Sequence, residues 1–299
     1  MEKNKNTSKI IIAAFSAFFL AGMIFATLFD FEISAFLTQL KQEENSFSMT
    51  FPLPSLFLEI LGEWPASVFG AFCAAVIMRS LLGTKKPAGY AGAAGMILLI
   101  FYVMYDCCEH TVEDVNFLVT DVRTFGTGDL IVAIPLTIIA SLAVILVALM
   151  ISQKAADRLL VPAIICAVML ASLLVGVQFI KALWGRIRFR DLFEAMDFSG
   201  FTAWYVPSFF SGGKSFPSGH TANAAALGLI PLFYSAKLKK RFPWLAKATY
   251  IAVAVWAVVM AFTRITVGAH YLSDVLVGGA LAFTAVMLGH YFMNKIRNA

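Results

Sequence analysis

The chain alternates long apolar runs with short polar segments, and this pattern predicts helices that cross a membrane. A helix needs about 20 mostly apolar residues to span the hydrocarbon core of a bilayer. We count about eight such runs, at residues 10–29, 65–83, 90–108, 130–152, 160–180, 216–236, 247–263 and 274–293. The predicted fold class is therefore all-α, a polytopic membrane helical bundle with about eight transmembrane helices.

The composition supports this class and the charges suggest an orientation. Hydrophobic residues make up 60% of the 299 residues and charged residues only 14%, against about 25% charged residues in soluble domains. Most basic clusters fall in segments 1–9, 84–89, 153–159, 237–246 and the tail after 293, which share one side. The positive-inside rule makes that side cytoplasmic. We expect a multi-pass protein of the plasma (inner) membrane with both termini cytoplasmic and no nucleic-acid partner.

One external segment carries basic residues against this rule. After the fifth predicted span come Lys181, Arg186, Arg188, Arg190 and Lys214. An anionic ligand bound at the outer membrane surface is one explanation. A solvated basic loop that contacts lipid headgroups is the other, and the charges alone do not decide between them.

The stretch KSFPSGHTAN, residues 214–223, opens the sixth predicted span. Pro217 suits the first turn of a helix. The helix would then begin with the small residues Ser218 and Gly219, whose accessible backbone N–H groups would form an anion site at the helix N-terminus. His220 could present a proton donor to the bound anion. The alternative is an ordinary capped helix start. A P-loop reading of GGKS fails, because that pattern requires glycine where this chain has Ser208.

A second cluster lies in TRITVGAHYLSD, residues 263–274. His270 and Asp274 are four residues apart, a spacing that places them on one helical face. The carboxylate would then hold one ring nitrogen as N–H and leave the other free to attack. Arg264 has the wrong phase for one continuous helix, but a break at Gly268 would bring it to His270. A surface His–Asp contact is the alternative.

The third cluster is KALWGRIR, residues 181–188. A spacing of seven is nearly two helical turns, so Lys181 and Arg188 would share a face and offer a point charge and a planar fork to a phosphate. Arg186 and Arg190 lie off this face, and we expect them to contact headgroups or solvent.

In order, these clusters read K-x6-R, PSGH and R-x5-H-x3-D, which resembles the three-part signature of the type 2 phosphatidic acid phosphatase family, the lipid phosphate phosphatases related to vanadium haloperoxidases. The resemblance covers Lys181 to Asp274. It implies a six-span phosphatase core at 90–299 behind a two-span extension at 1–89. Two positions depart from the family pattern: Phe189 replaces the usual proline and Thr263 the usual serine.

The resemblance also implies roles for individual residues. His270 looks like the nucleophile that forms a phosphohistidine, Asp274 like its orienting partner, and His220 like the acid that protonates the leaving oxygen. The residues that look like the phosphate cradle are Lys181, Arg188, Ser218, Gly219 and Arg264. No metal or cofactor is implied.

The expected function is hydrolysis of a lipid phosphomonoester or lipid pyrophosphate at the outer, periplasmic face of the membrane. Candidate substrates are phosphatidate, phosphatidylglycerol phosphate, a polyprenyl pyrophosphate and a lipid A type. The aromatic stretch 198–213 favours a lipid, but a phosphatase for a soluble phosphate ester stays an alternative. A non-catalytic headgroup binder or transporter is another. A metal site in the acidic segment 106–114 is a weaker interpretation than solvated surface.

Overall fold

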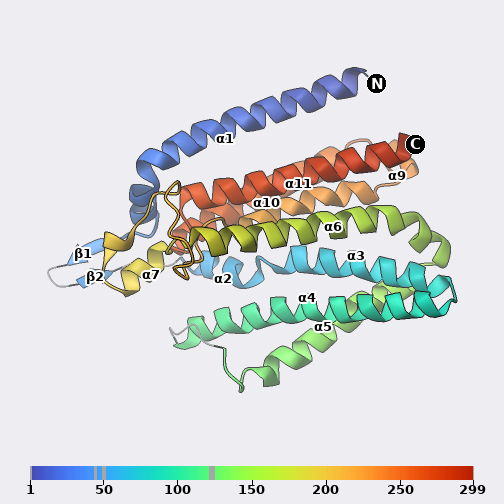
Figure 1. Ribbon diagram of the computed structural model, residues 1–299, viewed down its shortest axis with the longest axis horizontal. Coiled ribbons are helices and arrows are strands. Elements are labelled where there is room, and N and C mark those ends of the chain that lie inside the picture. Colours follow the sequence, from blue (N-terminus) through green and yellow to red (C-terminus); the bar gives the residue numbers. More distant parts are fainter. Residues whose placement is uncertain (1, 44–45, 49–51, 121–124, 299) are drawn as a thin grey trace. The chain divides into compact units, whose positions relative to one another are not determined.

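The computed structural model describes residues 2–43, 46–48, 52–120 and 125–298, and these residues are mostly helical (Figure 1). The elements are α1 (Glu2–Leu37), β1 (Lys41–Glu43), β2 (Ser46–Ser48), α2 (Leu53–Leu61), α3 (Trp64–Gly83), α4 (Pro87–Thr120), α5 (Leu130–Met150), α6 (Gln153–Trp184), α7 (Phe189–Glu194), the 3₁₀ helix η1 (Phe198–Gly200), α8 (Gly219–Ala226), the 3₁₀ helix η2 (Leu227–Phe233), α9 (Ala236–Arg241), α10 (Leu245–Thr266) and α11 (Leu272–Asn298). The short antiparallel β1–β2 ribbon is an addition to the expected all-α fold.

Within the described residues, seven helical segments are long and apolar enough to cross a membrane. They are Ile10–Leu37, Leu53–Gly83, Pro87–Phe117, Leu130–Met150, Gln153–Glu194, Leu245–Thr266 and Leu272–Arg297. The polytopic helical bundle predicted from the hydrophobic pattern is therefore confirmed.

The run at 216–236 differs from the expected single span. It forms α8, of 8 residues, and then η2, a 3₁₀ helix of 7 residues. Pro231 lies inside η2 and has no N–H to donate to a continuing α-helix. A 3₁₀ helix rises faster per residue than an α-helix, so the two pieces together extend by about 26 Å, close to the thickness of about 30 Å of a hydrocarbon core.

The chain divides into two compact units. The first comprises Met1–Ser55, Val175–Ala222 and Val258–Leu281, and the second comprises Leu56–Leu174, Asn223–Ala257 and Ala282–Ala299. All eight residues predicted to form the active site lie in the first unit. The predicted boundary at residue 89 stays a prediction.

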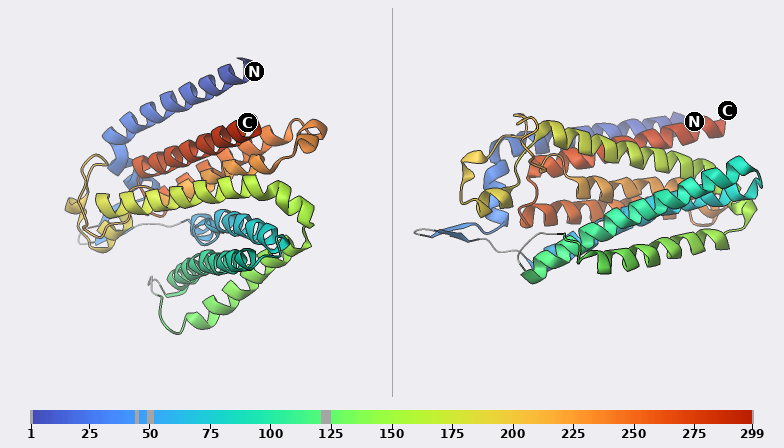
Figure 2. Two further views of the ribbon diagram at one scale, coloured as in Figure 1. Left: turned by 45° about the vertical axis from the view of Figure 1, so that its right-hand side comes forward. Right: turned by 60° about the horizontal axis from the view of Figure 1, so that its bottom comes forward.

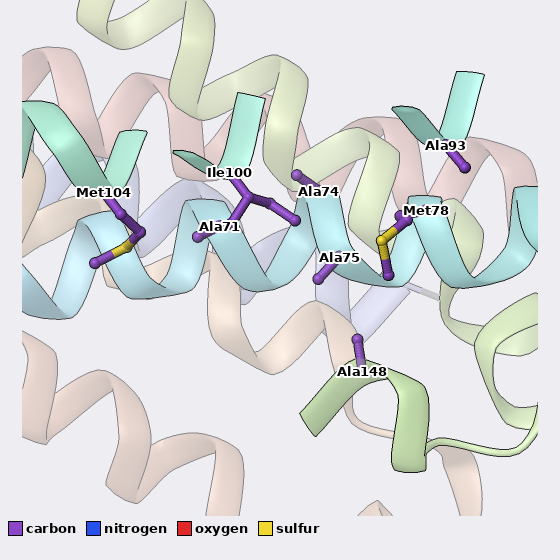
Figure 3. Packing of buried hydrophobic residues seen from close by; sticks show 8 residues of the cluster. All are labelled: Ala71, Ala74, Ala75, Met78, Ala93, Ile100, Met104 and Ala148. Atoms are coloured by element: carbon purple, nitrogen blue, oxygen red, sulfur yellow. The ribbon is translucent and has the colours of Figure 1, made fainter. Parts of the chain in front are cut away.

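In the second unit, α3 packs between small and flexible apolar side chains of α4 and α5 (Figure 3). The buried cluster consists of Ala71, Ala74, Ala75 and Met78 of α3, Ala93, Ile100 and Met104 of α4, and Ala148 of α5. Small residues at such contacts let helix backbones approach closely, which is how helices associate where lipid surrounds them.

In the first unit, α1 is kinked at Phe29, whose backbone angles of φ −135° and ψ 16° are not helical. Figures 1 and 2 show the bend near the C-terminal end of α1, before the β1–β2 ribbon. The same unit contains the end of α6, α7, the long loop 195–218, the start of α8, the end of α10 and the start of α11. The candidate site is built from these ends.

Candidate active site

The turn between α10 and α11 brings His270 back to Arg264. Gly268 has φ +63°, a conformation that glycine adopts without strain. Beyond it, the backbone N–H groups of Ala269 and His270 donate to the carbonyl of Arg264, at 3.1 and 3.2 Å. The predicted break at Gly268 is therefore confirmed, and it places the two motif residues side by side along the backbone.

His270 is held as one defined tautomer. Its Nδ1 lies 2.5 Å from the carbonyl oxygen of Ser215. A carbonyl can only accept a hydrogen bond, so Nδ1 carries the proton and donates it, and the lone pair is left on Nε2. The side chain is 2% exposed. Burial lowers the pKa of His270 to about 3; the carboxylate of Asp274 opposes this shift, and the positive charge of Lys181 adds to it. The ring is neutral at pH 7.

Asp274 is fully buried and lies in the first turn of α11. Its Oδ2 accepts the backbone N–H of Tyr271 at 2.8 Å and the hydroxyl of Ser215 at 2.5 Å. It lies 3.6 Å from Nδ1 of His270. His270 precedes α11, which begins at Leu272. The prediction that His270 and Asp274 share one helical face is therefore wrong. The two residues meet through a turn, and the Ser215 carbonyl takes the hydrogen bond that we assigned to Asp274.

The surroundings of Arg186 differ most from the sequence prediction. We expected headgroup or solvent contacts, but it is 1% exposed. Its guanidinium lies over the ring of Tyr271, 3.9 Å from the centroid. Its nitrogen atoms donate to oxygen atoms of Asp274 (2.7 Å), Ser273 (2.8 Å), Asp30 (3.0 Å) and the Thr202 carbonyl (2.9 Å). Arg186 therefore forms a buried ion-pair network that holds the carboxylate of Asp274.

The PSGH segment lies against the start of α11. The N–H of Ser218 donates to the carbonyl of Asp274 at 3.0 Å. On α11, a Cβ at Gly278 would lie 2.3 Å from the carbonyl oxygen of Ser218, so only glycine permits this approach. Ser218 also caps α8, because its hydroxyl accepts the N–H of Thr221 at 3.4 Å. Pro217 lies before this cap and outside the first helical turn, contrary to our expectation.

Gly219 and His220 are the first two residues of α8, and both are half-buried. A Cβ added at Gly219 would lie 3.6 Å from Nζ of Lys181. The ammonium group of Lys181 therefore stands beside the first N–H groups of α8. An ammonium group and a helix N-terminus together form an electropositive corner suited to phosphate oxygens.

The helical face expected for Lys181 and Arg188 does not form. α6 ends at Trp184, and Gly185 has φ +59°. Arg188 follows in extended conformation, with φ −71° and ψ 152°, and it is half-buried. A shared role in phosphate binding for the two basic residues thus depends on this turn and not on helical phase.

Arg190 is buried, contrary to the solvent or headgroup contact that we expected. Its backbone N–H donates to the carbonyl of Gly268 at 2.9 Å, and its Nε lies 4.0 Å from Asp191. Arg190 thereby ties α7 to the turn that carries His270.

The metal site considered for the acidic segment 106–114 finds no support in the described part of the chain. Across residues 2–43, 46–48, 52–120 and 125–298, no three His, Cys, Asp or Glu side chains are grouped to hold a metal ion. The four cysteines are buried, and none of them forms a disulfide.

Comparison with known proteins gives the class of this site. Residues 162–298 match the family model described as PAP2 superfamily. This range contains all three motifs. It confirms the resemblance to the type 2 phosphatidic acid phosphatases drawn from them.

Two curated relatives carry the name phosphatidylglycerophosphatase B. The chain is 33% identical over 96 residues to the one from Bacillus subtilis (strain 168), covering 31% of this chain and 46% of the relative. It is 35% identical over 83 residues to the one from Haemophilus influenzae (strain ATCC 51907 / DSM 11121 / KW20 / Rd), covering 28% of this chain and 34% of the relative. The matches span less than half the length of either relative. No solved structure matches the chain.

Proposed function

We propose that the protein is an integral membrane phosphatase that hydrolyses a lipid phosphomonoester or lipid pyrophosphate through a phosphohistidine. One observation carries the proposal. His270 is buried and neutral, its Nδ1–H donates a hydrogen bond to the Ser215 carbonyl, and Asp274 lies 3.6 Å from Nδ1. A neutral imidazole with a free Nε2 is a nucleophile. A site that only bound a phosphate would gain nothing from keeping this nitrogen unprotonated.

In the proposed reaction, the lone pair of His270 Nε2 attacks phosphorus in line with the ester oxygen. The bond from phosphorus to that oxygen breaks, and His220 gives its proton to the departing alcohol or phosphate. His220, now neutral, then takes a proton from water as the water attacks the phosphohistidine. The phosphorus–nitrogen bond breaks, inorganic phosphate forms, and His270 returns to its neutral state.

The proposed phosphate cradle consists of Lys181, Arg188, Ser218, Gly219 and Arg264. Two features support it: the Lys181 ammonium beside the start of α8, and the charges of Lys181 and Arg264 acting on His270. Positioned cations and N–H groups stabilise the charge that develops on the equatorial oxygens of a transferred phosphoryl group.

A lipid substrate agrees with the surroundings of the site. The loop from residue 198 to 213 exposes Tyr205, Phe209 and Phe210, and aromatic side chains are enriched at membrane–water interfaces. The curated relatives are named for phosphatidylglycerophosphate, so we take this lipid phosphate as the first candidate. A soluble phosphate ester is the second candidate.

We further propose that the reaction takes place at the outer face of the membrane. The basic clusters place residues 84–89 and 237–246 in the cytoplasm by the positive-inside rule. α8 and η2 must then cross the membrane, and their combined rise of about 26 Å is sufficient for this. The motif residues lie at the opposite ends of these spans.

The test is phosphate release by the purified full chain in mixed micelles. We expect phosphatidylglycerophosphate to be hydrolysed faster than its deacylated headgroup. His270→Asn should abolish turnover, whereas His290→Asn should retain it, because the ring of His290 hydrogen-bonds Tyr250 on α10 and has no part in the proposed site. No release from either substrate by the wild type would refute the proposal. Equal rates on both would favour the soluble ester.

A further inference from the structure

An acidic side chain lies buried on the first membrane helix. Asp30 of α1 belongs to the apolar segment Ile10–Leu37 and is 4% exposed. A carboxylate at such a position is costly unless it is paired, and such residues commonly mark functional sites. Asp30 also lies outside the range 162–298 that matches the PAP2 superfamily. Neither the motifs nor the comparisons assign it a role.

Among the described residues, the hydrogen-bond partners of the Asp30 carboxylate, Arg186 and Ser273, belong to the network that holds Asp274. Its Oδ2 accepts from Nη2 of Arg186 at 3.0 Å, and Oδ1 accepts the backbone N–H of Ser273 at 2.9 Å. The hydroxyl of Ser273 also donates to Oδ2 and accepts from Nη1 of Arg186 at 2.8 Å. Asp30 and Asp274 thus share one guanidinium, and Asp30 caps the start of the helix that carries Asp274.

Aromatic packing docks this part of α1 onto the site. The ring of Phe31 lies 5.4 Å from that of Phe189 and 5.3 Å from that of Phe201. Nearer the N-terminus, Thr27 accepts from the indole of Trp204 at 2.9 Å. Phe189 is the residue that replaces the usual motif proline. Its fully buried ring packs against α1, so the departure from the motif and the extra helix fit each other.

The charge balance gives Asp30 a chemical consequence. When His270 attacks phosphorus, its ring becomes positively charged, and the negative charge of Asp274 stabilises it. Arg186 alone would neutralise Asp274. With Asp30 present and ionised, the guanidinium is shared between two carboxylates, and the network of Arg186, Asp30 and Asp274 then carries one net negative charge beside His270.

We propose that α1 completes the active site: Asp30 is a positioning residue that, with Arg186, fixes Asp274 and the start of α11 and keeps their charge available to His270. The inference rests on the proposed function, because it concerns the rate of that reaction. It assigns no substrate contact to Asp30.

The experiment compares Asp30→Asn with Glu32→Gln in the full chain, using phosphate release from phosphatidylglycerophosphate. Both variants remove one negative charge from α1, but Glu32 is exposed. We expect Asp30→Asn to lower kcat on the order of 10²-fold, as small misplacements of catalytic groups do. The KM and the inhibition constant of inorganic phosphate should change less than about threefold, because Asp30 does not touch the cradle. Glu32→Gln should match the wild type.

The amplitude of phosphoenzyme formation after rapid mixing counts the competent molecules and separates positioning from folding. A lower kcat per competent site supports the inference. A loss confined to the amplitude, or a kcat within twofold of the wild type, overturns it. If Asp30→Asn does not fold, Ser273→Ala decides by the same criteria, since it keeps both charges but removes their bridging hydroxyl. A wild type without turnover refutes the proposed function itself, whereas an active wild type with an equally active Asp30→Asn refutes only this inference.

Discussion

Replacing Arg186 by methionine tests whether the two buried carboxylates depend on one cation. The variant keeps an unbranched apolar side chain about as long as the arginine stem but removes the guanidinium. Asp30 and Asp274 then lose bonds of 3.0 and 2.7 Å while both stay buried. Removing one partner of a buried ion pair typically costs about 3–5 kcal/mol, because an uncompensated charge is left behind. We expect a loss of this size in the free energy of unfolding.

A double-mutant cycle isolates the pairing from the packing. If Arg186 and Asp30 act as one network, Asp30→Asn should be less costly in the Arg186→Met background than in the wild type. Residues that share such a network show interaction energies of about 0.5–3 kcal/mol. The assay is reversible unfolding of the purified protein in mixed micelles of fixed composition, followed by tryptophan fluorescence. The four proteins of the cycle are measured side by side.

Additive effects of the two substitutions would refute this reasoning. They would mean that Asp30 is neutral or is satisfied by Ser273 without Arg186. An Arg186→Met variant as stable as the wild type would show that burial of the guanidinium contributes nothing net, as occurs when a buried pair is replaced by apolar packing. The cycle separates these cases because the first is an interaction energy of zero, whereas the second is a zero change in the free energy of unfolding of the single variant Arg186→Met.

Three further predictions concern backbone fit, protonation and sidedness. Gly278→Ala should reduce phosphate release strongly, because its Cβ would lie 2.3 Å from the Ser218 carbonyl; full activity would contradict the close approach. The pKa of His270 is about 3 in the folded state and about 6.5 unfolded, so the unfolded state binds more protons between these values. The free energy of unfolding should therefore fall from about pH 7 to about pH 4, less steeply in His270→Asn, as chemical denaturation would show. In a cysteine-free background, Val206→Cys should react with an impermeant thiol reagent in intact cells and Lys237→Cys should not; the reverse result places the site in the cytoplasm.

The hydrophobic pattern predicted most of the helices because a span is a local property. Length and apolarity decide whether a segment can cross a bilayer, and both can be counted along the chain. The prediction failed at 216–236, where a single continuous helix was expected. There Pro231 and the tight 3₁₀ geometry of η2 replace the second half of an α-helix. The apolar run was recognised correctly, but its backbone conformation was not.

The motifs were located by their spacing, but their geometry came from turns. Gly268 was expected to break α10 and does so. Gly185, with φ +59°, ends α6 in the same way, and we did not expect this helix end from the sequence. It removed the helical face assumed for Lys181 and Arg188. A glycine after a long apolar run was the available signal, since such a position commonly ends a helix.

Arg186 could not be assigned from the sequence because its partners are remote. Asp274 lies 88 residues away along the chain, and Asp30 lies 156 residues away. No local pattern distinguishes a buried arginine from the neighbouring basic residues of the segment GRIR. The acidic residues Asp30 and Glu32 near the end of the apolar segment of α1 were a usable hint, since an unpaired carboxylate there is unfavourable. It implied a cation somewhere, without indicating which one.

The electrostatic effect of this network can be related to the proposed chemistry. Phosphorylation of Nε2 leaves a positive charge on the ring of His270, with Asp274 only 3.6 Å from Nδ1. At an effective dielectric constant of about 20, a full charge at this distance is worth about 5 kcal/mol. A guanidinium bound to Asp274 alone would cancel much of that attraction. Asp30 offsets the guanidinium in turn, so Arg186 can hold the orientation of Asp274 while the cluster keeps its negative charge. In the proposed reaction, a helix that lies outside the three motifs therefore acts on the barrier to forming the phosphohistidine.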